Sequence, residues 1–241
     1  MSSLSILKFF VTPAHDCSYL EGKEARTLFI DPNINITEAQ YSELSDLGFR
    51  RSGNFIYRPH CEGCSQCIPV RIPVVRFSMS KRQRRIWRKN QAMHVELLAP
   101  EFSEEHYRLY ERYISQRHRD GDMYPPSEQQ YTSFLMNEWG KTFFIEFRQH
   151  HQLVAVAVTD RLSNGLSAIY TFFDPDMPQQ SLGVFSVLTQ IECAKSMELP
   201  YLFLGYWIKQ CQKMAYKNEY QPLEVFIDNH WQDLPSFTAT N

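Results

Sequence analysis

The sequence predicts an α+β protein built as two halves around mixed, largely antiparallel sheets. Two observations lead to this fold class. Apolar residues make up 43% of the chain and charged residues 22%, which is the balance of a soluble globular protein. In the second half, runs rich in β-branched and aromatic residues are separated by short turns, which join antiparallel strands. The 241 residues suffice for two packed halves, which we expect over 1–100 and 101–241.

The first half contains two helices with recognisable starts. Thr37 and Gln40 fit a capping box at the start of the first helix, and Gly48 ends it. Ser80 is suited to cap the second helix, because its hydroxyl can accept a bond from a free amide of the first turn. The predicted elements are a helix over 37–47, strands over 49–57 and 68–75, a helix over 81–90 and a strand over 94–98.

The second half is predicted to begin with two helices, of which the first places Tyr107, Tyr110 and Ile114 on one side. The predicted elements are helices over 103–119 and 127–139, strands over 143–148, 153–160 and 166–173, a helix over 182–197, a strand over 201–208, a helix over 210–217 and a strand over 224–227. Three antiparallel strands followed by helix, strand, helix and strand resemble the order of the GNAT-type N-acyltransferase fold.

The net charge of −2 conceals one strongly basic segment. Residues 71–89 hold eight of the 25 lysines and arginines and none of the 27 acidic residues, so the rest of the chain is acidic. Such a protein is suited to meet a polyanion in one place. On the predicted helix, four cations share one side, at Lys81, Arg84, Arg85 and Arg88.

Arginine predominates in this segment, and its guanidinium matches phosphate geometry better than an ammonium does. We therefore expect contact with a nucleic-acid backbone; the alternative is a solvated basic face. The residues predicted to contact this backbone are Lys81, Arg82, Arg84, Arg85, Arg88 and Lys89. If about four phosphates are neutralised, the logarithm of the affinity should fall with the logarithm of the salt concentration at a slope of about −3 to −4.

The chain has six cysteines. No export signal is visible in the opening residues, so we expect a cytoplasmic protein without structural disulfides. Cys61, Cys64 and Cys67 follow two successive spacings of two residues, which lets thiolates turn toward one metal ion. A fourth ligand could come from Cys17, His15 or His60. The alternative is a tight turn with free thiols. No apolar run approaches the ~18 residues of a membrane helix.

The start of the helix over 182–197 bears on the acyl donor. Acetyl-CoA enzymes of this fold carry Gln/Arg-x-x-Gly-x-Gly/Ala there, because small residues let backbone amides approach a diphosphate. Here the segment reads Gln180-Ser-Leu-Gly183-Val-Phe185. We interpret Phe185 as an obstruction to the diphosphate, which argues against coenzyme A. Acyl transfer with a polyanion surface instead suggests tRNA as the acyl carrier.

Motifs along most of the chain resemble the arginyl-tRNA–protein transferase superfamily, in particular its short bacterial branch. They are Cys17-Ser-Tyr-Leu20, Phe49-Arg-Arg-Ser-Gly53, Tyr57-Arg-Pro-His-Cys61, Cys67-Ile-Pro-Val-Arg71, Ser80-Lys-Arg-Gln-Arg-Arg85, Tyr170-Thr-Phe-Phe-Asp-Pro-Asp176, Ser181-Leu-Gly183 and Tyr201-Leu-Phe-Leu-Gly-Tyr-Trp-Ile208. The resemblance implies two GNAT-like halves. It also implies transfer of leucine from leucyl-tRNA to proteins that begin with Asp or Glu, which marks them for N-degron degradation.

The chain departs from the eukaryotic arginyltransferases in its cysteines. Leu20 stands where that branch has the second cysteine of an early pair, and Cys64-Ser-Gln-Cys67 replaces an adjacent pair linked to metal or iron–sulfur binding. The chemistry itself needs no cofactor, and a metal ion or iron–sulfur cluster at the three cysteines stays an open alternative. Arginyl-tRNA as the donor, an acetyl-CoA-dependent N-acetyltransferase and a metal-dependent RNA-binding module are the competing functions.

The expected reaction is aminolysis of an ester by an α-amine, with a ribose hydroxyl as leaving group. Orientation and oxyanion stabilisation should supply most of the acceleration. We predict Tyr170, Asp174 and Tyr206 as catalytic residues, with Asp174 holding the amine or a ribose hydroxyl. The alternative for the aromatic residues is core packing, and for Asp174 a turn before Pro175.

Binding of the two substrates requires further residues. An acidic first residue of the acceptor calls for a cation, for which Arg76 and Lys209 are the candidates. Phe173 and Trp207 are predicted to bind the donor, through the leucyl side chain or the terminal adenosine. These aromatic residues lie at strand ends, where the two parts of such a sheet separate.

Overall fold

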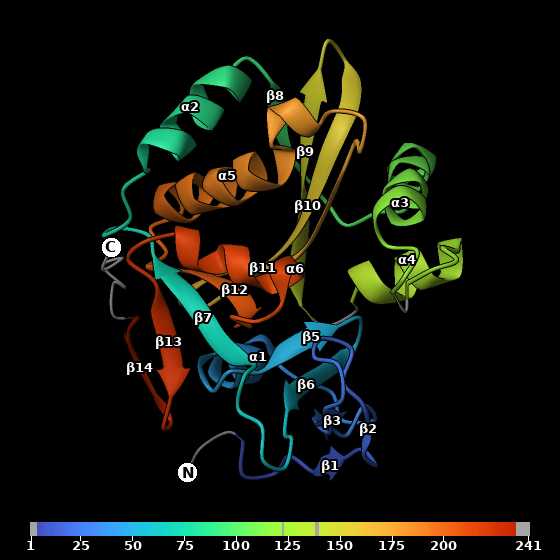
Figure 1. Cartoon of the computed structure of the whole chain (residues 1–241), viewed down its shortest axis with the longest axis vertical. Coiled ribbons are helices and arrows are strands. Elements are labelled where there is room, and N and C mark those ends of the chain that lie inside the picture. The colour runs from blue at the N-terminus through green and yellow to red at the C-terminus, as the bar shows by residue number, and fades with distance from the viewer. Residues whose placement is uncertain (1–3, 122, 138–139, 235–241) are drawn as a thin grey trace.

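The computed structural model describes residues 4–121, 123–137 and 140–234, and it contains two main sheets (Figure 1). The smaller one has the strand order β1-β4-β6-β5 and lies at one end of the molecule. Its elements, with a separate hairpin of β2 and β3, are β1 (Phe9–Val11), β2 (His15–Asp16), β3 (Glu24–Ala25), β4 (Thr27–Ile30), α1 (Glu38–Asp46), β5 (Arg50–Ser52) and β6 (Phe55–Pro59).

The larger sheet has eight strands in the order β14-β13-β7-β12-β11-β10-β9-β8. Its strands are β7 (Ile68–Pro73), β8 (His94–Leu98), β9 (Lys141–Gln149), β10 (Gln152–Leu162), β11 (Gly165–Phe173), β12 (Tyr201–Trp207), β13 (Glu224–Ile227) and β14 (His230–Asp233). All neighbours are antiparallel except β11 and β12, which are parallel. β7 and β8 belong to the first hundred residues and yet pair within this sheet, while the division into halves near residue 100 stays a prediction.

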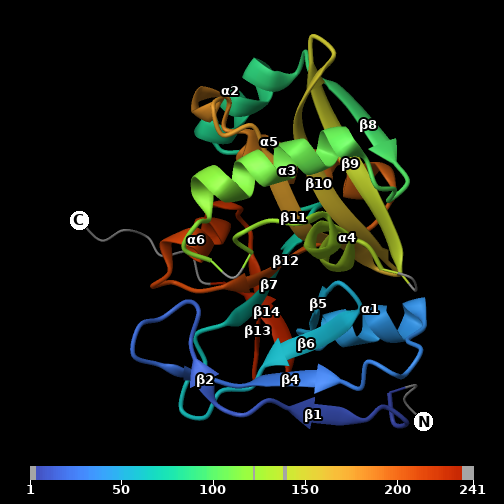
Figure 2. The same ribbon diagram turned by 90° about the vertical axis from the view of Figure 1, so that its right-hand side faces the viewer.

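Helices cover both faces of the larger sheet. On one face α5 packs against β10, β11 and β12 with α2 beside it, and on the other α3 packs against β10 and β11 with α4 next to it (Figure 2). The remaining bounds are α2 (Lys81–Asn90), α3 (Glu104–Arg117), α4 (Glu128–Leu135), α5 (Leu182–Ser196), α6 (Gln212–Ala215) and the 3₁₀ helices η1 (Pro178–Gln180) and η2 (Tyr216–Glu219). Within the described ranges, no helix combines the length and apolar character needed to cross a membrane.

The predicted α+β class with mixed, largely antiparallel sheets is confirmed, and both capping boxes form. The single strand expected over 49–57 is wrong, because the chain turns and makes β5 and β6. Gly53 explains the turn: its φ is +58°, and a Cβ there would lie 2.0 Å from the carbonyl oxygen of Ser133. The helix expected over 210–217 is instead α6 followed by η2, and the end of the helix expected over 127–139 lies outside the described residues.

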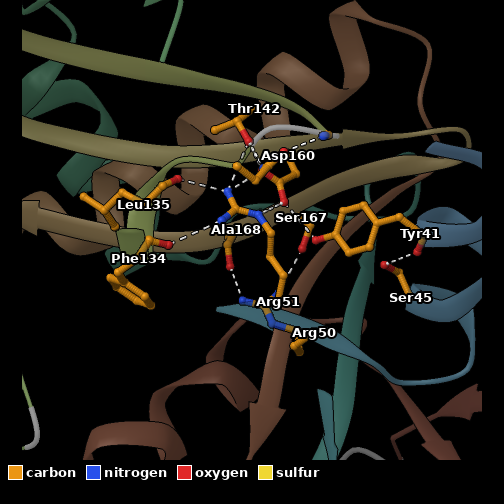
Figure 3. A network of polar contacts seen from close by, with 12 residues as sticks. Tyr41, Ser45, Arg50, Arg51, Phe134, Leu135, Thr142, Asp160, Ser167 and Ala168 are labelled. Atoms are coloured by element: carbon orange, nitrogen blue, oxygen red, sulfur yellow. Dashed lines mark hydrogen bonds and ion pairs between the residues drawn. The ribbon is translucent and has the colours of Figure 1, made fainter. Parts of the chain in front are cut away.

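A buried ion pair joins the small sheet to the large one (Figure 3). Arg51 of β5 donates from Nε and Nη2 to the carboxylate of Asp160 on β10, at 2.5 and 2.7 Å, and neither side chain is exposed. The hydroxyls of Tyr41 and Thr142 also donate to Asp160, at 2.8 and 2.7 Å. Arg51 further donates to the backbone carbonyl of Leu135. Since buried charges need such complete pairing, this network fixes the position of β5, and with it Arg50, against the large sheet.

Candidate functional site

The parallel strands β11 and β12 separate along their length. They pair only at their first three residues, and Ser167 opposite Phe203 is the last pair. Beyond that pair, residues 168–171 of β11 are partly exposed, although β11 lies in the interior of the sheet. We call the region between 168–173 of β11 and 204–207 of β12 the strand divergence. It is where the sequence predicts aromatic residues at the ends of separating strands.

Bulges in both strands accompany the separation. Ile169 is an extra residue of β11 opposite β10, and Leu204 is an extra residue of β12 opposite β7. Such bulges bend a strand and are frequent next to active sites. Gly205, the next residue of β12, has a φ of +77°, in the left-handed region that favours glycine. A Cβ at Gly205 would lie 2.9 Å from Nε of Arg50, so glycine also makes room for that guanidinium.

Arg50 of β5 reaches from the small sheet into the strand divergence (Figure 3). Its Nη1 donates to the hydroxyl of Ser167 at 3.0 Å, and its Nη2 donates to the carbonyl of Ala168 at 2.5 Å. The guanidinium thus binds β11 where its pairing with β12 ends. Several other arginines form ion pairs with carboxylates, among them Arg51, Arg71, Arg76, Arg112 and Arg148. Arg50 forms none with any carboxylate of the described residues.

A lysine that the sequence analysis did not single out lies beside β12. Lys217 of η2 is 5% exposed, and its Nζ donates to the carbonyl of Tyr206 at 2.5 Å and to Sδ of Met214 at 3.2 Å. Burial, and then the charge of Arg50, lower the pKa of Lys217 to about 7. No local pattern marks this residue, whereas Arg50 belongs to the motif Phe49-Arg-Arg-Ser-Gly53, which served only as a family signature.

Tyr170 and Phe173 lie on the open part of β11, and both are half-buried. The ring of Tyr170 packs against three aromatic rings from α3 and α4, those of Tyr110, Tyr113 and Phe134. Burial raises the pKa of Tyr170, so its hydroxyl stays protonated at neutral pH and can donate a proton or a hydrogen bond. The ring of Phe173 contacts Tyr113, with centroids 4.8 Å apart. These residues give the strand divergence one aromatic side.

Tyr206 and Trp207 are 5% and 6% exposed. The hydroxyl of Tyr206 donates to the carbonyl of Gly48 at 3.0 Å, and burial raises its pKa. The indole of Trp207 donates to the carbonyl of Ala215 at 3.3 Å. Both residues therefore have the packing roles that the alternative interpretation describes: Tyr206 holds the small sheet, and Trp207 holds α6. Their catalytic and donor-binding roles stay predictions.

Asp174 directly follows β11 and is 5% exposed. Its Oδ1 accepts from Nη2 of Arg112 at 3.0 Å and from the backbone N–H of Asp176 at 3.0 Å. The carboxylate thus closes the turn before α5, as the alternative interpretation describes, and already has a cationic partner. Its role toward the amine or a ribose hydroxyl stays a prediction.

The two cations predicted to bind the acceptor lie in different places. The guanidinium of Arg76 donates to both carboxylate oxygens of Asp233, at 2.7 and 2.8 Å, and contacts Glu224 at 3.4 Å. These partners belong to β14 and β13, and β7 separates β13 from β12. Lys209 is exposed in the turn after β12, beside the strand divergence in sequence. The structure therefore does not bring Arg76 and Lys209 together.

The predicted basic helix is present as α2, and its six cations are all exposed. The helix is anchored by Gln83, Ile86 and Asn90, which are buried. Three of the cations also contact the protein: Arg82 forms an ion pair with Glu219, Arg84 donates to the carbonyl of Met79 at 2.5 Å, and Lys89 donates to a backbone carbonyl of η1 at 2.8 Å. Because η1 immediately precedes α5, the basic surface of α2 lies next to the start of α5.

Phe185 does not have the expected orientation. It is 2% exposed, and its ring packs in the core against Trp87 and Phe147, with centroids 5.3 and 5.5 Å away. The interpretation that Phe185 obstructs a diphosphate is therefore wrong, because its side chain points into the core below α5. Gly183, in the first turn of α5, lies against Phe173 of β11. A Cβ added at Gly183 would lie 3.2 Å from the ring of Phe173.

Five of the six cysteines lie close to one another near β6 and β7, and the sixth, Cys193, lies in α5. Burial and the neighbouring thiols of Cys17, Cys61, Cys64 and Cys211 raise the pKa of Cys67 to about 12. In the part of the chain that the structure describes, no three His, Cys, Asp or Glu side chains are arranged to hold one metal ion. A metal ion or iron–sulfur cluster at Cys61, Cys64 and Cys67 stays a prediction, and no step below uses one.

Two family models match most of the chain. The model described as the N terminus of arginine-tRNA-protein transferase matches residues 15–85, and the model of its C terminus matches residues 105–227. Among solved structures, L-PGS from Bacillus licheniformis aligns with 59% of this chain and 47% of that chain, at a TM-score of 0.48 and 12% identity.

Close relatives match over nearly the whole length. The aspartate/glutamate leucyltransferase of Alcanivorax borkumensis is 56% identical over 97% of this chain and 96% of that protein. The proteins of the same name from Marinobacter nauticus and Hahella chejuensis are 53% and 51% identical, over 97% and 96% of this chain and 99% of each relative. With both family models and these relatives in agreement, the chain belongs to the arginine-tRNA-protein transferase family.

Proposed function

We propose that this chain transfers leucine from leucyl-tRNA to the α-amine of proteins that begin with Asp or Glu, which marks them for N-degron degradation. The observation that carries the proposal is the match to proteins named aspartate/glutamate leucyltransferase, at 56% identity over 97% of the chain for the Alcanivorax protein. The structure fits this function, because it offers an opened sheet beside aromatic residues and an exposed basic helix on the same molecule.

The reaction forms an amide bond to the leucyl carbonyl and breaks the ester bond to the ribose. The attacking α-amine has an ordinary pKa of about 7.7–8.0, so a large share of it is neutral near pH 8. The proton lost by nitrogen leaves with the ribose oxygen. We assign the hydroxyl of Tyr170 to the developing charge on that oxygen, since its raised pKa keeps it protonated and it lies on the open part of β11. Orientation supplies the rest of the acceleration.

The donor would bind across β11, α5 and α2. We place the leucyl side chain against the aromatic group around Tyr170, which contains Tyr113 and Phe173. The tRNA backbone would follow the exposed cations of α2, which the bond from Lys89 to η1 holds next to the start of α5. These assignments put the ester at the strand divergence and the phosphates outside it.

We also propose that the unit β11–α5–β12 belongs to a GNAT-like half, and that the first half of the chain is a second one. The strand order, the bulged β11 and its separation from β12 support this proposal. The reaction would take place in the cytoplasm, because its donor is a charged tRNA.

The test offers purified protein charged leucyl-tRNA, charged arginyl-tRNA or acetyl-CoA, each with peptides that begin with Asp, Glu, Asn or Lys. Mass spectrometry of the peptides identifies donor and acceptor together. We expect a mass gain of one leucine on the Asp and Glu peptides only. A gain of arginine would identify arginyl-tRNA as the donor. A gain of an acetyl group would identify the protein as an acetyl-CoA-dependent N-acetyltransferase. No gain with any donor would refute the proposal.

A further inference from the structure

The strand divergence contains two cations that no step above uses. Arg50 lies against Gly205, and Lys217 donates to the carbonyl of Tyr206, the next residue of β12. The two cations, from β5 and η2, therefore contact consecutive residues of β12. The charge of Arg50 is one of the causes that lower the pKa of Lys217, which agrees with their proximity. Among the described residues neither forms an ion pair with a carboxylate, whereas the adjacent Arg51 pairs with Asp160.

The groups around the two cations are neutral. Burial raises the pKa values of Tyr57, Tyr206 and Tyr216. These side chains are therefore protonated at neutral pH and add no negative charge. Positive charge taken out of water without a counter-ion is unfavourable. An anionic group of a substrate would supply the complementary charge at this place.

We propose that Arg50 and Lys217 bind the side-chain carboxylate of the acceptor's first residue and thereby select Asp and Glu over Asn and Gln. This inference rests on the proposed function. Arg50 is the direct partner, because it is half-buried and uses two of its five N–H groups, on Ser167 and Ala168. Lys217 is buried beside the carbonyl of Tyr206, and its ammonium adds positive charge there at and below its pKa of about 7.

A carboxylate fits this place better than a phosphate of the donor. The cations suited to phosphates lie outside on α2, where all six are exposed. Arg50 also lines a small cavity, together with Gly48, Phe49 and Gly205, that measures about 10 Å³. That volume holds no more than one water molecule, so we place the approach of the anion to Arg50 at the strand divergence. A small planar carboxylate can meet a guanidinium there with two parallel bonds.

The test compares Arg50→Gln and Lys217→Met with the wild-type protein on peptides that begin with Asp or Asn. Two quantities are measured: the dissociation constants of fluorescent peptides without tRNA, and kcat/KM for leucine transfer from leucyl-tRNA. We expect the preference for Asp over Asn to fall about 10–100-fold in Arg50→Gln, the size of a lost charge-assisted pair. In Lys217→Met we expect a smaller fall. The KM for leucyl-tRNA should stay unchanged.

Matched controls separate the site from its surroundings. Arg58→Gln removes an arginine of the same small sheet that donates to the carbonyl of Leu47, and Lys213→Met removes a lysine of α6 that pairs with Asp120. Both controls should keep the preference for Asp. Thermal melts followed by circular dichroism establish that each variant is folded. If Arg50→Gln does not fold, Arg50→Lys takes its place, and it should keep part of the preference because it keeps the charge.

If folded Arg50→Gln and Lys217→Met keep the wild-type preference for Asp over Asn, the inference is overturned. Leucine transfer by the wild-type protein would still uphold the proposed function in that case. A rise in the KM for leucyl-tRNA, with the preference intact, would assign the two cations to a phosphate and would also overturn it. A wild-type protein that binds Asp peptides more tightly than Asn peptides, loses this difference in Arg50→Gln and transfers no leucine would support the carboxylate site and refute the proposed function.

Discussion

At the residue scale, two adjacent arginines of β5 have opposite surroundings. Arg51 is fully buried and bonded to Asp160, whose carboxylate also accepts from Tyr41 and Thr142 (Figure 3). Arg50 is half-buried and bonded only to neutral groups among the described residues. Successive residues of a strand point to opposite sides, so β5 sends one arginine into the joint between the sheets and the other into the strand divergence. The bonds of Arg51 to Asp160 therefore hold β5, and with it Arg50, in place.

The buried pair gives a stability prediction. Asp160→Asn removes the counter-charge of Arg51 and should lower the free energy of unfolding by about 3–5 kcal/mol, the usual cost of a buried charge left unpaired. Urea unfolding at pH 7 measures the change. Asp176→Asn is the control, because that carboxylate is 66% exposed and pairs with Arg112 at the surface; it should cost less than about 1 kcal/mol. Equal losses in the two variants would contradict the role of the Arg51–Asp160 pair.

Lys217 predicts how stability depends on pH. Its pKa is about 7 in the folded protein and near 10.5 when unfolded, so between these values the unfolded chain holds a proton that the folded chain has released. Stability due to this group therefore rises with pH above 7, by up to about 1.4 kcal/mol per pH unit. From pH 7 to 9 the wild-type protein should gain about 2 kcal/mol relative to Lys217→Met. Urea unfolding of both at several pH values measures it; a constant difference would contradict the lowered pKa.

At the element scale, the starts of α1 and α2 were predictable, and the contacts at the strand divergence were not. The starts of α1 and α2 follow from Thr37 with Gln40 and Ser80 with Gln83, because capping signals lie within four residues. Arg50 meets Ser167 and Ala168 across more than a hundred residues of sequence, and no local pattern encodes such a contact. The sequence placed Tyr170 on the strand that is β11, Tyr206 on the strand that is β12 and Asp174 in the turn after β11, but their partners came only from the tertiary structure.

The element that carries the basic surface gives the next prediction. Arg84→Glu combined with Arg85→Glu reverses two exposed charges of α2 without touching its buried side. The affinity for tRNA should fall about 10–100-fold at low salt, and the slope of log affinity against log salt should become shallower by about 2. Filter binding over a salt series measures both. Arg108→Glu combined with Arg119→Glu makes the same charge change away from α2 and should affect the affinity less; equal effects would remove α2 from the tRNA surface.

At the scale of the whole molecule, the two halves of the chain share one sheet. β7 comes from the first hundred residues and lies between β12 and β13, and β8 forms the opposite edge beside β9. The joint at Asp160 and the hydroxyl of Tyr206 bind the small sheet to the same body. The charge is also unevenly distributed, because a chain with a net charge of −2 presents six cations on the single helix α2. Fold and function therefore both depend on contacts between halves.

This sharing predicts that residues 101–241 alone do not fold cooperatively. The fragment lacks β7 and the residue that follows it, where Val70, Ile72 and Val74 are each at most 1% exposed in the core beneath α5. Burial of such side chains stabilises by about 1.5–3 kcal/mol apiece, so their loss is comparable with the 5–15 kcal/mol that typically holds a protein folded. Near-ultraviolet circular dichroism during urea unfolding should show a sharp transition for the full chain and none for the fragment. Addition of a separate 1–100 fragment should restore the transition, because it returns β7 to its place between β12 and β13. A sharp transition in 101–241 alone would show that the second half folds without β7.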